Sequence, residues 1–221
     1  MPNLLSSDAL IAPLFGDSLK GEPHVFDFSS ANPATLSYDP ANFQAFQSAV
    51  YGELERSGKT WGLGKYLEER STILRNFPQI LSEERIYHAG LDITSLPGTP
   101  LFAPLDAVVF ATGKEEGIGN YGGFVILKHE RVTLSGVEGY SFYGHLHSRH
   151  IVSEGKRVAA GERFAVIGDG GDSGGWFTHT HLQLITEEAR RRERMFHGYV
   201  SKADLSDIEQ LFPSPVMFFQ H

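Results

Sequence analysis

The pattern of apolar and polar positions along the chain changes near residue 86. Between residues 40 and 77, apolar side chains recur at spacings of three and four, which is typical of helices that bury one face. This spacing predicts two helices, Pro40–Glu55 and Lys65–Phe77, on either side of the glycine-rich hinge Gly58–Gly64. The first 40 residues mix Pro, Ser, Asp and Gly with short apolar pieces, so we expect loops with one or two short strands there.

After residue 86 the apolar residues occur in short or alternating runs bounded by Gly, Pro and Asp. Such runs favour antiparallel β-sheet closed by tight turns. The predicted strands are Gly90–Thr94, Pro100–Phe102, Ala107–Thr112, Gly123–His129, Gly139–His145, Arg157–Val158, Arg163–Ile167 and His179–Ile185. We therefore predict a mainly β fold, α+β overall, because the N-terminal extension is partly helical.

These patterns divide the chain into an N-terminal extension (1–85), a β-domain (86–188) and a C-terminal tail (189–221). In the tail we expect a short helix over Leu205–Leu211, ended by Pro213, and an apolar end, Val216–Phe219, that covers the core. The charge run Glu187–Arg194 mixes both signs and is typical of a solvated helix face. At 221 residues the chain is long enough to bury a full core.

Composition restricts the chemistry that this chain can perform. A formal net charge of -8 and a pI near 5.7 argue against a nucleic-acid partner, since phosphate binding needs clustered Lys and Arg. The chain has no cysteine, which excludes a thiol nucleophile, a disulfide framework and a cysteine zinc site. Any metal must therefore be held by nitrogen and oxygen ligands.

The N-terminus lacks the features of a secretory leader. Residues 1–12 carry no basic start, and Pro13 interrupts the apolar stretch Ala9–Phe15. No segment has the length of a membrane span. We expect a cytoplasmic protein on this basis, or a periplasmic or extracellular one if the chain lacks its leader, and the sequence does not indicate an oligomeric state.

His179 and His181 are separated by one residue inside a predicted strand. Side chains alternate along a strand, so both rings point to the same face, with α-carbons about 6.7 Å apart. Both rings can therefore face one cavity, although the pair could also be structural.

His88 and Asp92 stand four residues apart in a His-x-Gly-x-Asp run. In a straight strand their α-carbons would be about 13 Å apart, too far to share one ion easily. Gly90 between them permits a bend or bulge that brings the two side chains together. We therefore expect a loop that runs into a strand.

His145 follows the aromatic run Tyr140–Tyr143, at the end of a predicted strand. It can be a core histidine or a site residue, and His147 would share its face, so the sequence does not choose between the two. Imidazole and carboxylate are ligands that zinc accepts, and three protein ligands with one open position are typical of catalytic sites. The histidines and Asp92 together indicate a metal-dependent hydrolase.

Five separated motifs, taken in order, resemble the M23 family of zinc metallopeptidases, of the lysostaphin and LytM type. The resemblance extends over about residues 86–186. Its motifs are His88–Asp92, Gly98–Pro100 with Ala103–Pro104, Gly122–His129, Tyr143–Leu146 and His179–Leu182.

The resemblance implies a fold, a cofactor and roles for the matching residues. It implies an antiparallel β-sheet groove with Zn2+ at its floor, held by His88, Asp92 and His181. It also implies that His145 and His179 flank the reacting water and the scissile carbonyl. The implied activity is that of a zinc-dependent endopeptidase acting on the cross-links and stem peptides of peptidoglycan.

Some positions depart from the family pattern. The segment Asp169–Trp176 precedes His179 and His181 in place of the family's usual aromatic or glycine-rich approach. Gln183 stands where an acidic residue is common. Trp176 can stack on substrate or anchor its loop. Together with Trp176, the segment Gly62–Arg70 resembles a branch of the family that also occurs as a module inside larger enzymes. A cytoplasmic peptidase or amidase with a non-wall substrate is therefore an alternative.

Three further alternatives follow from the same residues. Some relatives have lost ligands and only activate other hydrolases, but this chain keeps all five positions. A cupin-like binding domain also gathers histidines on strands, but it usually places two histidines and a carboxylate in one motif. Residues 1–86 could lie across the groove and keep an enzyme latent, or they could pack as an extension.

Overall fold

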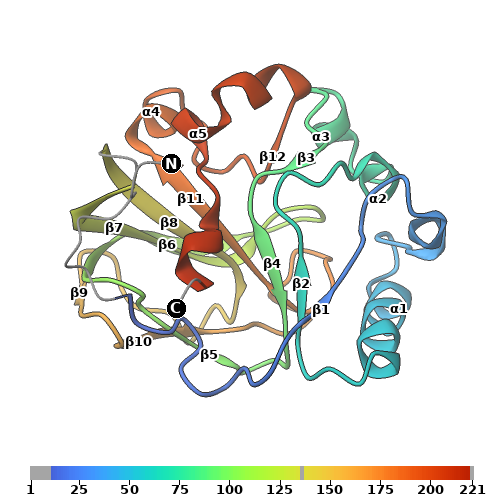
Figure 1. Cartoon of the computed structure of the whole chain (residues 1–221), viewed down its shortest axis with the longest axis horizontal. Coiled ribbons are helices and arrows are strands. Elements are labelled where there is room, and N and C mark those ends of the chain that lie inside the picture. Colours follow the sequence, from blue (N-terminus) through green and yellow to red (C-terminus); the bar gives the residue numbers. More distant parts are fainter. Residues whose placement is uncertain (1–10, 135–136, 220–221) are drawn as a thin grey trace.

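The computed structural model describes residues 11–134 and 137–219, and a large β-sheet forms the centre of this part of the chain (Figure 1). Eight strands of the described residues make this sheet, in the order β1-β2-β4-β11-β8-β7-β6-β9. All neighbours pair antiparallel except β1 and β2, which pair parallel. The strands are β1 (His24–Val25), β2 (Gly62–Gly64), β4 (Leu91–Thr94), β6 (Ala107–Glu115), β7 (Gly122–Leu134), β8 (Val137–Leu146), β9 (Arg157–Val158) and β11 (Thr180–Thr186).

Two small antiparallel pairs complete the β structure that the described residues form. In one pair β10 (Arg163–Val166) lies beside β5 (Pro100–Phe102), and in the other β12 (Tyr199–Val200) lies beside β3 (Tyr87–His88). Each strand predicted after residue 86 is present, with ends that differ by a few residues. The prediction of a mainly β fold with a partly helical extension is confirmed.

The first predicted helix is present as α1 (Phe43–Arg56). The side chain of Asn42 caps it by accepting a hydrogen bond from the Ala45 backbone N–H at 3.1 Å. Its buried face, formed by Phe46, Val50 and Leu54, packs in an aromatic cluster with residues of the β1 region. The recurrence at three and four positions therefore identified a real amphipathic helix.

The second predicted helix, Lys65–Phe77, is wrong. The structure has two single-turn helices in this region, α2 (Ser71–Leu74) and α3 (Pro78–Leu81). Before them the chain turns at Leu67, whose φ is 55°, and pairs its backbone with a neighbouring strand. The Leu67 N–H donates to the His88 carbonyl at 2.7 Å, and the His88 N–H donates to the Glu68 carbonyl at 3.0 Å. These groups are unavailable for helical hydrogen bonds because β3 uses them.

Hydrophobic side chains fill both faces of the main sheet. Along β7, Val125 and Leu127 point into one cluster while Phe124 and Ile126 point into another, as the alternation of a strand requires. A third cluster lies between the extension and the β-domain and contains Trp176 and Phe177. The sheet is thus covered on both faces by apolar side chains.

The C-terminal tail packs against the β-domain. It contains α4 (Glu187–Arg191), a 3-10 segment (Lys202–Asp207), α5 (Ile208–Leu211) and a final 3-10 turn (Pro215–Phe219). The helix expected over Leu205–Leu211 is therefore half 3-10 and half α. Phe218 is buried in the core, as expected for the apolar end, whereas Val216 is exposed.

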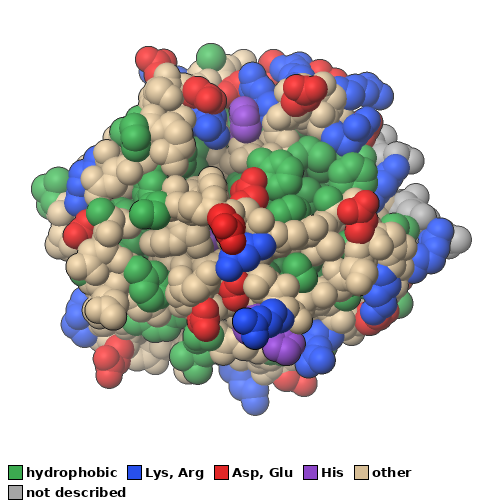
Figure 2. Space-filling view, turned by 180° about the vertical axis from the view of Figure 1, so that it is seen from behind, with side chains coloured by type: hydrophobic (Ala, Val, Ile, Leu, Met, Phe, Trp, Pro, Cys, Tyr) green, Lys and Arg blue, Asp and Glu red, His purple; other side chains and the backbone are tan. Residues whose placement is uncertain are grey.

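The predicted N-terminal extension shares the main sheet with the β-domain. Strand β2 pairs with β4, with Gly64 opposite Asp92, so residues on both sides of position 86 belong to one sheet. Among the described residues, none of the helices combines the length and apolar character that crossing a bilayer requires. Acidic and basic side chains are interspersed over the face shown in Figure 2.

Candidate metal centre

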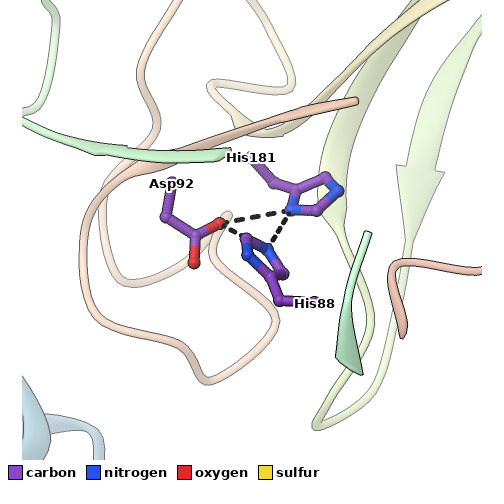
Figure 3. A group of neighbouring side chains, drawn as sticks. All are labelled: His88, Asp92 and His181. Carbon is purple, nitrogen blue, oxygen red and sulfur yellow. Dashed lines mark hydrogen bonds and ion pairs between the residues drawn. The ribbon is translucent and has the colours of Figure 1, made fainter. Parts of the chain in front are cut away.

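Three strands bring His88, Asp92 and His181 together. His88 ends β3, Asp92 lies on β4, and His181 lies on β11 directly opposite Asp92. Figure 3 shows the three side chains pointing toward one another. One ligand atom from each residue lies within 4.8 Å of the others, and all three residues are buried. The convergence predicted from the sequence is present.

The three ligand atoms are close enough to surround one ion. Nε2 of His88 lies 3.0 Å from Nδ1 of His181, and each of these nitrogens lies 3.2 Å from Oδ1 of Asp92. Gly90 makes the approach possible. A Cβ at this position would lie 2.5 Å from the Leu182 carbonyl oxygen and 2.6 Å from Cε1 of His181. Only glycine fits where the chain bends between His88 and Asp92.

Outer hydrogen bonds direct a lone pair of each imidazole toward the centre. Nδ1 of His88 lies 3.0 Å from the Lys65 carbonyl, so it donates there and leaves Nε2 unprotonated. The Gln183 amide donates to the His197 carbonyl at 3.1 Å, so its oxygen faces Nε2 of His181 at 2.9 Å and accepts from it. Two nitrogen lone pairs and a carboxylate oxygen thus face one point, a donor set that fits a divalent cation.

The charge state of the centre also suits a metal. Burial opposes ionisation of Asp92, but His88 and Arg70 overcome this effect and hold the pKa of its carboxyl well below the usual value. Burial, reinforced by the Arg70 guanidinium, lowers the pKa of His88 to about 4. Aspartate binds a metal as a carboxylate, and histidine binds it as a neutral imidazole. Asp92 and His88 are in these forms at neutral pH.

His145 and His179 lie beside the three convergent residues. Their rings are 4.4 Å apart between centroids, and burial lowers the pKa of His145 well below its usual value. Nδ1 of His179 donates to the Phe177 carbonyl at 2.7 Å, and its Nε2 lies 3.4 Å from Oδ1 of Asp92. Both histidines are therefore neighbours of the candidate centre, and burial keeps His145 neutral.

The structure distinguishes His145 from His147. His145 adopts a φ of 59°, a conformation that two backbone hydrogen bonds hold, with its N–H on the Tyr121 carbonyl and its carbonyl on Gly168. This turn directs its side chain toward His179. His147 instead lies 3.8 Å from Oδ2 of Asp172, with a partly exposed side chain. The strand pattern could not choose between them because it gives no sign of the turn, and only the family resemblance implied His145.

All five predicted site residues line one cavity of about 130 Å³. Further lining residues come from the extension, the β6–β7 connection, the loop before β11 and the tail. They are Gln79, Ile80, Arg85, Glu115, Gly119, Asn120, Tyr121, Trp176, Phe196, Gly198 and Tyr199. No motif or spacing in the sequence singled these out except for Trp176.

Trp176 anchors its loop, although it also reaches the cavity. It is 6% exposed and stacks on Phe77 at 4.7 Å between ring centroids. The extension behaves similarly, because it packs against the β-domain and also contributes Gln79, Ile80 and Arg85 to the cavity wall. The extension therefore both packs against the β-domain and forms part of the cavity wall.

Residues 86–192 match the family model of Peptidase family M23. These residues belong to peptidase family M23. The M23 domain of this chain thus begins just before His88 and extends past the end of β11, and it includes the five predicted site residues.

One curated relative is named a metalloprotease. Over 176 residues the chain is 30% identical to an uncharacterized metalloprotease of Haemophilus influenzae, an alignment that covers 76% of this chain and 34% of that protein. The chain therefore spans about a third of the length of this curated relative.

Solved structures of similar proteins include two named peptidases. A zinc-containing peptidase from Vibrio cholerae is 22% identical, with a TM-score of 0.38, over 46% of this chain and 28% of that one. The catalytic domain of lysostaphin, an antimicrobial peptidase of Staphylococcus simulans, is 21% identical, with a TM-score of 0.39, over 56% of this chain and 80% of that one.

Proposed function

We propose that this protein is a zinc-dependent metalloendopeptidase that hydrolyses peptide bonds in peptidoglycan cross-links or stem peptides. One observation carries the proposal: a ring nitrogen of His88, a ring nitrogen of His181 and a carboxylate oxygen of Asp92 lie within 4.8 Å of one another, on the wall of a cavity. The match of residues 86–192 to Peptidase family M23 supports a peptidase. The resemblance of its motifs to lysostaphin-type enzymes supports a wall peptide as substrate.

His88, Asp92 and His181 would hold the zinc ion. When bound, zinc polarises the substrate carbonyl and lowers the pKa of water toward about 7. The residues themselves contribute geometry and charge. Burial keeps the His88 imidazole neutral, and the strand register holds Asp92 opposite His181 before any metal arrives.

His179 and His145 would handle the proton and the developing oxyanion. Because Nδ1 of His179 donates to the Phe177 carbonyl, its Nε2 carries a lone pair that can accept a proton from the attacking water. The ring centroid of His145 lies 4.4 Å from that of His179, so His145 is then placed to donate a hydrogen bond to the oxyanion. Stabilisation of this kind is worth roughly 3 to 4 kcal/mol of barrier.

Digestion of wall peptides by the zinc-loaded protein tests the proposal. We expect cleavage that a chelator abolishes and that zinc restores. His145→Ala and His179→Ala should each lower turnover by at least about 100-fold and still bind one zinc ion, because neither is assigned as a ligand. His147→Ala is the matched control and should cleave normally. Loss of zinc from either of the first two variants would contradict the assignment, and zinc-bound protein without turnover would indicate a non-catalytic activator.

The size of the cavity favours a second candidate, a peptidase or amidase that acts on short non-wall substrates. Its volume of about 130 Å³ is below the roughly 300 Å³ at which ligand pockets usually begin. Gln79, Ile80 and Arg85 of the extension wall it on one side, so an end of a peptide fits better than the middle of a long strand. Parallel assays on cross-linked muropeptides and on dipeptide amides separate the two candidates.

A further inference from the structure

We infer that Gly64–Arg70, a segment outside the residues that match the M23 family, forms the outer shell of the metal centre, with Arg70 as a positioning residue that fixes how Asp92 binds metal. The inference rests on the proposed metal site. It concerns residues that the sequence marks as a motif and that the proposed chemistry does not use.

The two carboxylate oxygens of Asp92 have different neighbours because Arg70 binds one of them. Its Nη1 donates to Oδ2 at 2.6 Å, while Oδ1 lies 3.2 Å from the ligand nitrogens of His88 and His181. Charge-assisted hydrogen bonds of this length are strong and directional. With Oδ2 held by the guanidinium, Asp92 offers a metal one oxygen.

Glu68 fixes Arg70 from the other side. The Nε of Arg70 donates to Oε2 of Glu68 at 3.0 Å, and both side chains are 3% exposed. Oε1 of Glu68 accepts from the Phe28 backbone N–H at 3.0 Å and lies 3.0 Å from Nζ of Lys65. A buried guanidinium needs opposite charges on its donors, and Glu68 supplies one while Asp92 supplies the other. Glu68 also offsets a positive charge that would otherwise repel the metal.

The rest of the segment is shaped around the same centre. Gly64 lies opposite Asp92 in the sheet, and a Cβ there would lie 2.8 Å from Nη2 of Arg70. The Lys65 carbonyl accepts from Nδ1 of His88, and the backbone of Leu67 and Glu68 pairs with His88. One segment therefore orients two of the three ligands, His88 through its carbonyl and Asp92 through Arg70.

Zinc affinity of the full-length chain, measured by competition with a chelator, tests this role. Arg70→Met should bind zinc about 10- to 100-fold more weakly, the usual loss when an outer partner of a ligand is removed. Arg70→Lys should recover only part of the affinity, because an ammonium cannot span both carboxylates as a guanidinium does. Arg75→Met is the matched control: Arg75 donates to the backbone carbonyls of Thr72 and Tyr38, and the control should bind like the parent.

The visible spectrum of the cobalt-substituted protein separates positioning from simple stabilisation. In Arg70→Met the freed Oδ2 can also bind the metal, so coordination increases and the absorption of bound cobalt weakens. A purely structural Arg70 would lower the melting temperature and leave this spectrum unchanged. A folded Arg70→Met with the zinc affinity and cobalt spectrum of the parent would overturn the inference.

Glu68→Gln is a second variant for the zinc-affinity measurement if Arg70→Met does not fold. Glutamine retains the size of the side chain and an oxygen acceptor for Arg70, but it leaves the guanidinium charge without compensation on that side. We expect about tenfold weaker zinc binding, the lower end of the range for outer partners, and unchanged affinity would count against the inference.

Metal binding and peptide cleavage can fail separately. A parent protein that binds zinc and cleaves no peptide contradicts the proposed function alone. If the parent cleaves peptide and the variants of Arg70 and Glu68 bind zinc as tightly as the parent, only the inferred role of the outer shell is contradicted.

Discussion

Histidines of this chain differ in their surroundings, and burial lowers the pKa of several of them. His88 and His129 are buried, and burial lowers the pKa of each to about 4. His147 and His150 lie in contact with each other outside the cavity that the site residues line, with a ring separation of 4.5 Å. Burial therefore keeps His88 and His129 neutral at neutral pH.

His129 gives a prediction for the pH dependence of stability. Its pKa of about 4 lies below the value of about 6.5 expected in the unfolded chain, so the unfolded state takes up a proton first as the pH falls. Its contribution is complete above pH 6.5 and is lost between pH 6.5 and 4. Between pH 7 and pH 5 we expect the metal-free protein to lose about 2 kcal/mol of unfolding free energy through this group.

Urea unfolding at the two pH values measures this loss. His129→Gln removes the titrating ring and should make the free energy of unfolding less dependent on pH. Equal pH dependence in the parent and in His129→Gln would refute the prediction.

The sequence predicted the residues of the candidate site better than their outer contacts. The bend at Gly90 and a shared face for His179 and His181 follow from backbone geometry, whereas the ligand set itself was implied by the resemblance to family M23. The ion pairs of Arg70 could not be predicted, because a charged residue in a motif does not reveal which partner it meets. Gln183 was noted as a departure, and only the structure shows that its oxygen accepts from His181.

At the scale of elements, strands after residue 86 were predictable because their alternation reports burial directly. The helix expected over Lys65–Phe77 failed for a reason that periodicity cannot detect. Glu68 and Arg70 face inward as a buried ion pair, and the backbone of this stretch pairs with β3. The parallel pairing of β1 with β2 was not predicted, because β2 lies in the segment expected to be a glycine-rich hinge.

The junction of β3 and β4 gives a prediction for Gly90. Gly90→Ala places a Cβ 2.5 Å from the Leu182 carbonyl, a contact with backbone that cannot move easily. We expect a loss of about 2 kcal/mol or more in unfolding free energy, together with weaker zinc binding, because β4 must shift away from β11. Thermal unfolding and zinc titration measure the two effects.

Gly52→Ala is the control for this substitution. Gly52 lies inside α1, where an added Cβ meets only the flexible end of Arg56. Alanine there should stabilise the protein by about 0.5 to 1 kcal/mol without changing zinc affinity. Similar behaviour of the two variants would contradict the account of the bend.

At the scale of the whole molecule, the extension and the M23 domain share a core that leads to the site. Phe46 of α1 is fully buried and packs against Phe177, with ring centroids 5.1 Å apart. Phe177 in turn stacks on His179 at 4.4 Å and accepts its Nδ1 proton through the backbone carbonyl. Packing of the extension thus supports a residue of the candidate site.

Truncating Phe46 tests this connection. Phe46→Ala should cost about 3 to 5 kcal/mol of unfolding free energy, the usual loss for a buried phenylalanine, and should lower turnover as His179 loses support. Leu36→Ala is the control, because Leu36 is 69% exposed and its loss should change stability by less than about 0.5 kcal/mol. Faster turnover in Phe46→Ala would instead favour an extension that keeps the enzyme latent.

The central claim is that His88, Asp92 and His181 hold one divalent ion. Anomalous scattering at the zinc edge, from crystals grown with zinc, locates the ion directly. The account predicts one strong peak about 2.0 to 2.2 Å from Nε2 of His88, Oδ1 of Asp92 and Nδ1 of His181. A zinc peak bound elsewhere, with these three side chains making no contact with it, would contradict the account.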